Sequence, residues 1–189
     1  MKRILFFLSL ALALASCDKN DISAELKDPH PLRIEQMVSF IGKNYDSVKV
    51  DLADTRVFLT GTAGHRKATL LVLDRESPNP NFICEISEKD GLISKIVIST
   101  VTGTYGTFKN TFHYFDNLLS EKYPLSKFYA IDANGEVNLS NKTKEELYTY
   151  LTYNSSSGAA LEFKTQNTKI LNFCFKESDK AFALTIEDK

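Results

Sequence analysis

Paired segments of β-branched and alternating apolar residues constrain the fold of this chain more than any other feature. Residues 82–87 and 92–101 flank the dipeptide Asp90-Gly91. Asp-Gly between two such segments favours a tight hairpin turn, because the turn requires positive φ and glycine adopts it without steric cost. The other segments of this kind are residues 47–52, 56–60, 68–73, 127–131, 136–139, 160–164, 169–176 and 181–187. The sequence therefore predicts a sheet built largely from antiparallel hairpins.

Two segments instead have the period of a helix with one apolar face. They are residues 33–43 and residues 107–123, the second of which ends at Pro124. A third, short helix is predicted after Thr143, because Glu146 three residues later completes a capping box. Helices between clusters of hairpin-forming strands predict an α+β fold. We expect a mainly antiparallel sheet with two to three helices packed on it, in a single domain.

The N-terminus has the layout of an export signal. Lys2 and Arg3 are followed by an apolar run over residues 4–14, and small residues then precede Cys17. The run is too short to cross a bilayer, which takes about 20 apolar residues. It indicates a secretory signal rather than a transmembrane helix. No other run in the chain approaches 18 apolar residues.

The sequence Leu14-Ala15-Ser16-Cys17 resembles the lipobox of bacterial lipoproteins. The resemblance implies that residues 1–16 are a signal peptide, and that Cys17 is lipid-modified, for instance with palmitate. The resemblance further implies a lipid-anchored protein of the cell envelope, held at the outer membrane on its periplasmic face or at the cell surface. The Lys/Asn/Tyr-rich body is similar in texture to lipoproteins of Bacteroidota. The alternative is a plain cleaved signal followed by a chance cysteine.

The segment after Cys17 is predicted to be a tether. Residues 17–32 contain two prolines and many charged residues, with few apolar positions and no sustained period. Such a segment cannot bury enough apolar surface to fold alone, so it is expected to be flexible. We therefore assign residues 17–32 to a lipid-anchored tether and residues 33–189 to one α+β globular domain.

The charge balance excludes one class of partner. The chain has 23 Lys+Arg against 24 Asp+Glu, a formal net charge of −1. Nucleic-acid binding that depends on counterion release needs a strong excess of cations. We therefore expect no nucleic-acid partner and a membrane association that runs through the lipid anchor.

Cys84 and Cys174 are an even pair in an oxidising compartment, which makes them a candidate disulfide. A bond would require facing strands with Cα atoms about 4.4–6.8 Å apart. The alternative is two buried free thiols that behave as small apolar residues. Neither a redox Cys-x-x-Cys nor a metal-ligand spacing is present.

The sequence contains no recognisable catalytic or cofactor motif. The three histidines are scattered, so no metal site is expected, and His113 is expected to face water. The Gly61–Thr69 segment departs from a phosphate-binding loop, because it leads into a β-rich run instead of a helix. We therefore predict no catalytic residue, no metal and no cofactor.

Two groups of residues are candidates for a binding surface. Tyr148 and Tyr153 lie on or beside the short helix, and tyrosine supplies contact area for protein or glycan ligands. His65, Arg66 and Lys67 form a basic loop tip that could meet an acidic partner. The alternatives are a packed helix face for the tyrosines and a solvated hairpin loop for the basic residues.

These observations favour a lipid-anchored, non-enzymatic binding module for a protein or glycan ligand, which includes an inhibitor or immunity-type role. The alternative is an envelope hydrolase. A convergent polar cluster in a deep pocket would favour the enzyme, and a shallow surface with exposed aromatics would favour the binder. The polar residues to follow are His65, His113, Asp51, Asp54, Tyr148 and Glu162.

Overall fold

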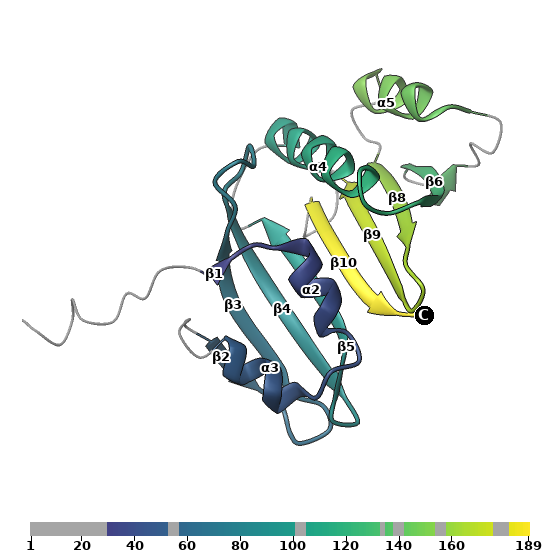
Figure 1. The fold of residues 1–189 in the computed structure, drawn as a ribbon. Coiled ribbons are helices and arrows are strands. Elements are labelled where there is room, and N and C mark those ends of the chain that lie inside the picture. The colour runs from purple at the N-terminus through teal and green to yellow at the C-terminus, as the bar shows by residue number, and fades with distance from the viewer. Residues whose placement is uncertain are drawn as a thin grey trace, which may run out of the picture.

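The strands of the protein form one sheet with helices packed on it (Figure 1). The computed structural model describes residues 30–52, 57–100, 105–132, 135–137, 142–153, 158–175 and 182–189. The helices are α2 (Ile34–Phe40), α3 (Tyr45–Asp51), α4 (Tyr105–Ser120) and α5 (Lys144–Tyr153). The strands are β1 (His30–Pro31), β2 (Val57–Thr60), β3 (Lys67–Leu73), β4 (Asn81–Lys89), β5 (Leu92–Thr100), β6 (Leu125–Asp132), β7 (Gly135–Val137), β8 (Gly158–Lys164), β9 (Thr168–Phe175) and β10 (Phe182–Asp188).

The sheet consists of two antiparallel meanders joined at their last strands. Its order is β1-β3-β4-β5-β10-β9-β8-β6-β7, with β2 also pairing with β3, and β1–β3 is the parallel pair. The meanders β3-β4-β5 and β8-β9-β10 meet where β5 pairs with β10, with Ile96 opposite Ile186. This arrangement confirms the α+β class and the mainly antiparallel sheet.

The Asp90-Gly91 hairpin is confirmed in its backbone detail. Asp90 has a φ of 54° and Gly91 a φ of 85°, so both central residues have the positive φ of a tight hairpin turn. Strands β4 and β5 pair on either side of the turn, with a register shift at Ser87/Glu88. Local turn chemistry therefore sets the start of this pairing.

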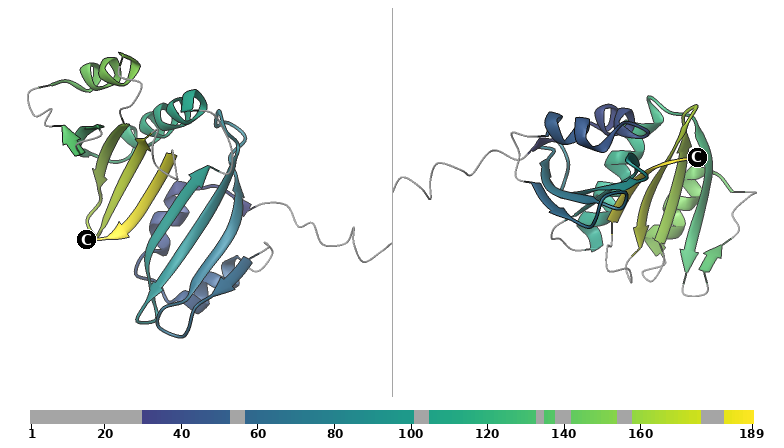
Figure 2. Two further views of the ribbon diagram at one scale, coloured as in Figure 1. Left: turned by 180° about the vertical axis from the view of Figure 1, so that it is seen from behind. Right: turned by 90° about the horizontal axis from the view of Figure 1, so that it is seen from below.

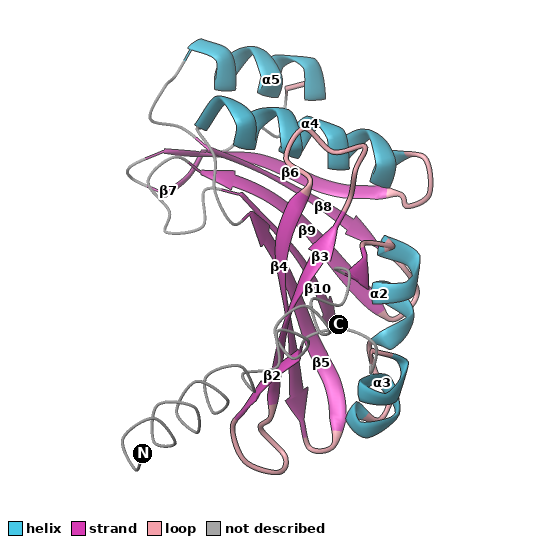
Figure 3. Cartoon of the chain, turned by 90° about the vertical axis from the view of Figure 1, so that its left-hand side faces the viewer, coloured by secondary structure: helices cyan, strands magenta, loops and turns pink. Residues whose placement is uncertain are grey.

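One face of the sheet is buried beneath the helices (Figure 3). Cys84, Ile98 and Leu184 are neighbours across β4, β5 and β10, and each is fully buried. On α4, Phe115 stacks on Phe182 with 5.4 Å between ring centroids. Burying one such side chain contributes about 1.5–3 kcal/mol, so these rings supply much of the attachment of α4 to the sheet.

A buried amide adds a polar link between α4 and the sheet. The Nδ2 group of Asn172 on β9 donates a hydrogen bond of 2.9 Å to the carbonyl oxygen of Phe112. Asn172 is fully buried. Because a buried donor must be paired, this bond favours one position of α4 along β9.

Residues 47–52, which were predicted to be a strand, belong instead to helix α3 and its exit. Val48 and Leu52 alternate with Val50 as in a strand, but Tyr45, Val48 and Leu52 also have helical spacing and are each about 2% exposed. The side chain of Asn44 accepts a hydrogen bond of 2.9 Å from the backbone N–H of Asp46 and so caps the helix start. The described residues therefore contain four helices, against the two to three expected.

The N-terminal boundary of the folded part also differs from the prediction. His30 and Pro31 were assigned to the tether, but they form β1 and pair with Val72 and Leu73 of β3. The folded part therefore includes the last residues of that segment. The signal peptide, Cys17 and the tether before residue 30 lie outside the described residues.

The capping box before α5 is confirmed. The backbone N–H of Thr143 donates to the carboxylate of Glu146 at 2.6 Å, and the N–H of Glu146 donates to the hydroxyl of Thr143 at 3.2 Å. Both donors at the helix start are thereby satisfied. Among the described residues, no helix is long and apolar enough to cross a membrane.

Candidate functional site

The face of the sheet opposite the described helices, which we call the open face, is the first candidate site. Figure 2 (left) looks onto it, with α2 and α3 behind the strands. Its side chains form three rows across the strands. The first row is Leu71, Ile83, Ser99, Ala183, Phe173, Ala160 and Tyr129; the second is Phe58, Thr69, Glu85, Val97, Thr185, Leu171, Glu162 and Lys127; the third is Thr60, Lys67, Ser87, Lys95, Glu187, Lys169 and Lys164. The rows change from largely apolar to largely charged.

Large apolar side chains are exposed at one end of the open face. Leu71 in the first row is 50% exposed, and Phe58 on the neighbouring edge strand β2 is 68% exposed. Ile83 and Phe173 in the first row are half-buried. An exposed apolar group bordered by polar residues is typical of an interaction surface.

The charged end of the open face is rich in lysine. Lys67 pairs with Glu85 at 2.6 Å, and Glu187 pairs with Lys169 at 2.6 Å and with Lys95 at 3.4 Å. The hydrogen bond from Lys169 lowers the pKa of Glu187. The three rows hold five lysines and three glutamates, so this face is basic on a chain whose formal charge is −1.

The sequence did not single out Leu71 or Phe58. Alternation within a strand shows that two faces differ, but it does not show which one the helices cover. The signal available was the presence of apolar residues on both faces of residues 68–73, where Leu71 interrupts the alternation.

The basic loop tip is partly committed to internal contacts. Arg66 donates to Glu88 from Nε at 2.8 Å and from Nη2 at 2.7 Å, and its Nη1 donates to Asp46 at 2.8 Å. Its guanidinium carbon lies 4.6 Å from the ring centroid of Tyr45. Arg66 therefore joins the β3 end of the sheet to α3. His65 is exposed, and Lys67 belongs to the third row of the open face.

The ion pair with Arg66 sets the charge state of Glu88. The side chain of Glu88 is 1% exposed. The hydrogen bond from the Arg66 side chain lowers the pKa of Glu88 to about 2, and the same pairing raises the pKa of Arg66. Glu88 is therefore a buried carboxylate that stays ionised.

Tyr148, a candidate surface aromatic, instead takes part in a partly buried cluster between α4 and α5. Its hydroxyl donates to the carboxylate of Asp116, which is 1% exposed. Asp116 also pairs with Lys144 at 2.6 Å and accepts a hydrogen bond from the hydroxyl of Ser120 at 3.0 Å. Burial and the bond to Asp116 raise the pKa of Tyr148. The side chain of Tyr153 lies outside the described residues.

His113 also belongs to this cluster and is half-buried, so the expectation that it faces water was wrong. Its ring lies on that of Tyr148, with 4.0 Å between centroids and 32° between planes. Burial lowers the pKa of His113, because desolvation disfavours the imidazolium.

His113 and Tyr148 lie together, as an enzyme's convergent polar cluster would require. The polar groups around Asp116 are, however, already engaged with one another. The carboxylate of Asp116 is already engaged by Tyr148, by Lys144 and by a serine hydroxyl. Glu162 lies elsewhere, on the open face, where Ser126 donates to it at 3.1 Å. Asp54 and the side chain of Asp51 lie outside the described residues. The contacts of the cluster hold α5 on α4.

Cys84 and Cys174 do not form the candidate disulfide. Both are buried free thiols. Cys84 is on β4 and Cys174 is on β9, and β5 and β10 lie between these strands. With neighbouring strands about 4.8 Å apart, this separation is far beyond the reach of a disulfide. Burial raises the pKa of each thiol to about 12.

Within the part of the chain that the structure describes, no three His, Cys, Asp or Glu side chains are gathered as metal ligands. The absence of a metal site and of a cofactor stays a prediction for the whole chain.

Comparison with known proteins adds one finding at the N-terminus. A model of the prokaryotic membrane lipoprotein lipid attachment site matches residues 1–17. Comparison with curated proteins gives no match. Among solved structures, the chain is similar to a cysteine-rich secretory protein from Staphylococcus aureus subsp. aureus Mu50, with 13% sequence identity and a TM-score of 0.37. The alignment covers 86% of this chain and 47% of that one, so the chain spans about half the length of that protein.

The lipid attachment site supports a bacterial lipoprotein that is anchored through lipid to the cell envelope. The match does not extend to a Bacteroidota origin or to a particular membrane or leaflet, which stay predictions from the sequence.

Proposed function

We propose that this lipoprotein is a non-enzymatic interaction module that holds another envelope protein against its open face. The observation that carries the proposal is the exposure of Leu71 and Phe58 on a sheet face that no described helix covers. A tethered protein benefits from such a surface, because anchoring keeps it at high local concentration near membrane-bound partners.

The chemistry of the open face favours a protein partner with an apolar centre and acidic residues on one side. Leu71, Ile83 and Phe173 of the first row offer area for hydrophobic contact, and the lysine-rich third row fits carboxylates. A glycan is less well matched, because the first row offers one ring with a polar group, that of Tyr129, and the chain contains no tryptophan. An inhibitor or immunity-type role is one form of this function, in which the open face covers a site on the partner.

The hydrolase alternative draws on the cluster of His113, Asp116 and Tyr148. A hydrolytic role needs a base or nucleophile with room for substrate beside it. Asp116 is 1% exposed and carries three polar contacts, so it serves the packing of two helices. The open face is therefore the better-supported site.

The proposal is tested by site-specific photo-crosslinking in intact cells that make the full-length chain. A photoreactive residue at Leu71 is expected to give one adduct of defined mass, and a residue at exposed Lys43 beside α2 serves as the control. Leu71→Glu should reduce recovery of the partner by about tenfold or more, as for a residue whose contact contributes strongly to an interface. Lys43→Glu should leave recovery unchanged, and raised salt should weaken it.

Two results would overturn the proposal. One is the same set of adducts from position 71 and from position 43. The other is turnover of an ester, glycoside or peptide substrate that Tyr148→Phe abolishes while the far-ultraviolet circular dichroism of the protein is unchanged. The second result would establish the hydrolase instead.

A further inference from the structure

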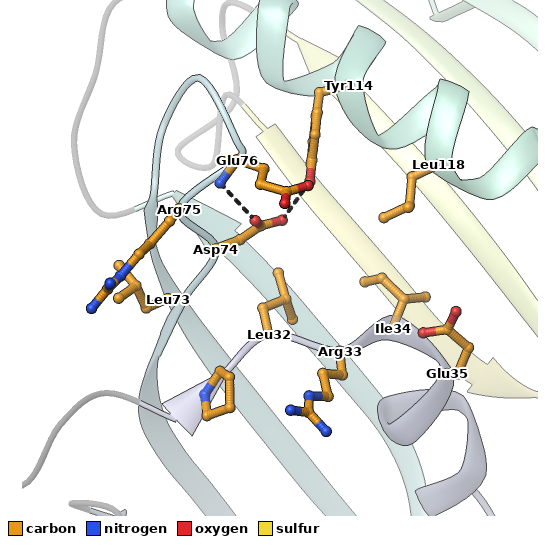
Figure 4. A pocket seen from close by; sticks show the side chains of 11 residues that line it. Leu32, Arg33, Ile34, Glu35, Leu73, Asp74, Arg75, Glu76, Tyr114 and Leu118 are labelled. Atoms are coloured by element: carbon orange, nitrogen blue, oxygen red, sulfur yellow. Dashed lines mark hydrogen bonds between the residues drawn. The ribbon is translucent and has the colours of Figure 1, made fainter.

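A pocket of about 520 Å³ lies where the chain enters its folded part (Figure 4). Pro31 and Leu32 line it on one side, the turn after β3 lines it on another, and α4 contributes Tyr114 and Leu118. This volume is within the range of about 300–1,000 Å³ that is typical of small-molecule sites. The pocket is distinct from the open face.

Carboxylates gather beside the tyrosine of the pocket. The hydroxyl of Tyr114 donates to Asp74 at 3.0 Å, and the backbone N–H of Glu76 donates to the other oxygen of Asp74 at 3.1 Å. Figure 4 shows the carboxylate of Glu76 beside this pair. Burial, the bond to Asp74 and the charge of Glu76 together raise the pKa of Tyr114. This part of the pocket is therefore anionic.

Two arginines also line the pocket, but they do not neutralise these carboxylates. Arg33 and Arg75 are exposed, and in Figure 4 their guanidinium groups point away from Asp74. Neither forms an ion pair with a described residue, whereas the third acidic residue of the lining, Glu35, pairs with Lys122. The wall thus carries charges of both signs that form no ion pair with a described residue.

Apolar side chains lie between and beside the two kinds of charge. Leu32 lies between the carboxylates and the guanidinium group of Arg33 in the close view, and Ile34 and Leu118 lie to one side of this line. A ligand complementary to the side chains that line the pocket needs an ammonium group, an anionic group and an apolar portion. Ammonium and phosphate both form strong charge-assisted hydrogen bonds with partners of this kind.

We propose that this pocket binds the headgroup of an ethanolamine phospholipid in the membrane that holds the lipid anchor. The ammonium group of the headgroup would donate to Asp74 and Glu76, and its phosphate would accept from an arginine. The start of the acyl chains would meet the leucine and isoleucine side chains.

The lipid anchor at Cys17 favours a membrane lipid, rather than a soluble zwitterion, as the ligand of this pocket. Pro31, in the pocket wall, follows Cys17 by 14 positions. A chain of that length spans at most about 50 Å when fully extended. The pocket is therefore held within reach of the bilayer, where headgroups are present at far higher local concentration than a dissolved ligand.

The test uses the mature chain with Cys17→Ser, which removes the acylation site and leaves binding to the pocket alone. Sedimentation is compared for vesicles of phosphatidylcholine with phosphatidylglycerol and for vesicles in which phosphatidylethanolamine replaces the phosphatidylcholine at constant anionic content. The ethanolamine vesicles should bind about fivefold more strongly, as expected for a partly exposed charge pair. The choline group is the matched control, because it carries the same charge without an N–H donor.

Variants of the pocket separate its role from general attraction to the membrane. Glu76→Gln keeps the side-chain size at an exposed position and should remove the ethanolamine preference, as should Asp74→Asn. Glu121→Gln, at an exposed position after α4, should keep the preference. Leu71→Glu should also keep it, because the open face takes no part in lipid binding.

Three results would overturn the proposal. Equal binding to choline and ethanolamine vesicles would show that the arginines act only as general cations near anionic lipid. Binding of soluble glycerophosphoethanolamine without a vesicle preference would assign the pocket to a dissolved zwitterion. Equal competition by N-acetyl-lysine amide and glycerophosphoethanolamine would assign it to a lysine of a protein partner.

Discussion

The hydroxyl of Tyr148 on α5 donates a hydrogen bond to the carboxylate of Asp116 on α4, and the acceptor is almost completely buried. Lys144, also on α5, pairs with the same carboxylate at 2.6 Å. A buried charge is costly unless its neighbours satisfy it. The contact between the two helices therefore depends on these partners as well as on apolar packing.

Tyr148→Phe should lower the free energy of unfolding by about 1–3 kcal/mol, because it leaves one acceptor position of a buried carboxylate unfilled. Urea unfolding followed by circular dichroism measures the change. Tyr123→Phe is the control, since no hydrogen bond of the Tyr123 hydroxyl joins it to a described residue, and it should change stability by no more than about 0.5 kcal/mol. Equal effects of the two substitutions would contradict this account.

Tyr45→Phe should have the opposite effect. Tyr45 is 2% exposed and its hydroxyl has no hydrogen-bond partner among the described residues. Removing a buried, unpaired hydroxyl while keeping the ring beneath Arg66 should raise the free energy of unfolding by about 1 kcal/mol. The same urea experiment tests this, and a loss of stability would show that the hydroxyl has a partner in solution.

The ion pair of Glu88 with Arg66 predicts a defined pH dependence. Pairing lowers the pKa of Glu88 from its ordinary value of 4.5 to about 2. Its contribution to stability is therefore fully present above pH 4.5 and is lost as the pH falls toward 2. The chain should be more stable than a Glu88→Gln variant near neutral pH, and the difference should shrink between pH 4.5 and 2. A difference that stays constant over this range, measured by urea unfolding at several pH values, would refute the assignment.

The two buried cysteines should remain thiols under oxidising conditions. In a chain with Cys17→Ser, a thiol reagent should react slowly with the native protein, because Cys84 and Cys174 are buried and the pKa of each is raised to about 12. After denaturation both thiols should react. Recovery of no reactive thiol from protein purified without a reductant would point to a disulfide and to a different strand order.

Features that depend on a few neighbouring residues could be predicted from the sequence. The lipid attachment site at Cys17, the Asp90-Gly91 turn and the capping box of Thr143 and Glu146 each arise from local chemistry. Helix α3 was missed although it is local. The spacing of Val48 and Leu52 fits both a strand and a helix, and the burial of Tyr45 on the same side decides between them.

The sequence by itself determined an exported, lipid-anchored chain with an α+β fold, because signal segments, turns and caps act over a few residues. Only the tertiary structure decided that two strands lie between Cys84 and Cys174, that Tyr148 reaches Asp116, and that Leu71 lies on an uncovered face. These relationships follow from the order of the strands and from the side on which the helices pack. Both depend on contacts between segments far apart in the chain, which no local pattern encodes.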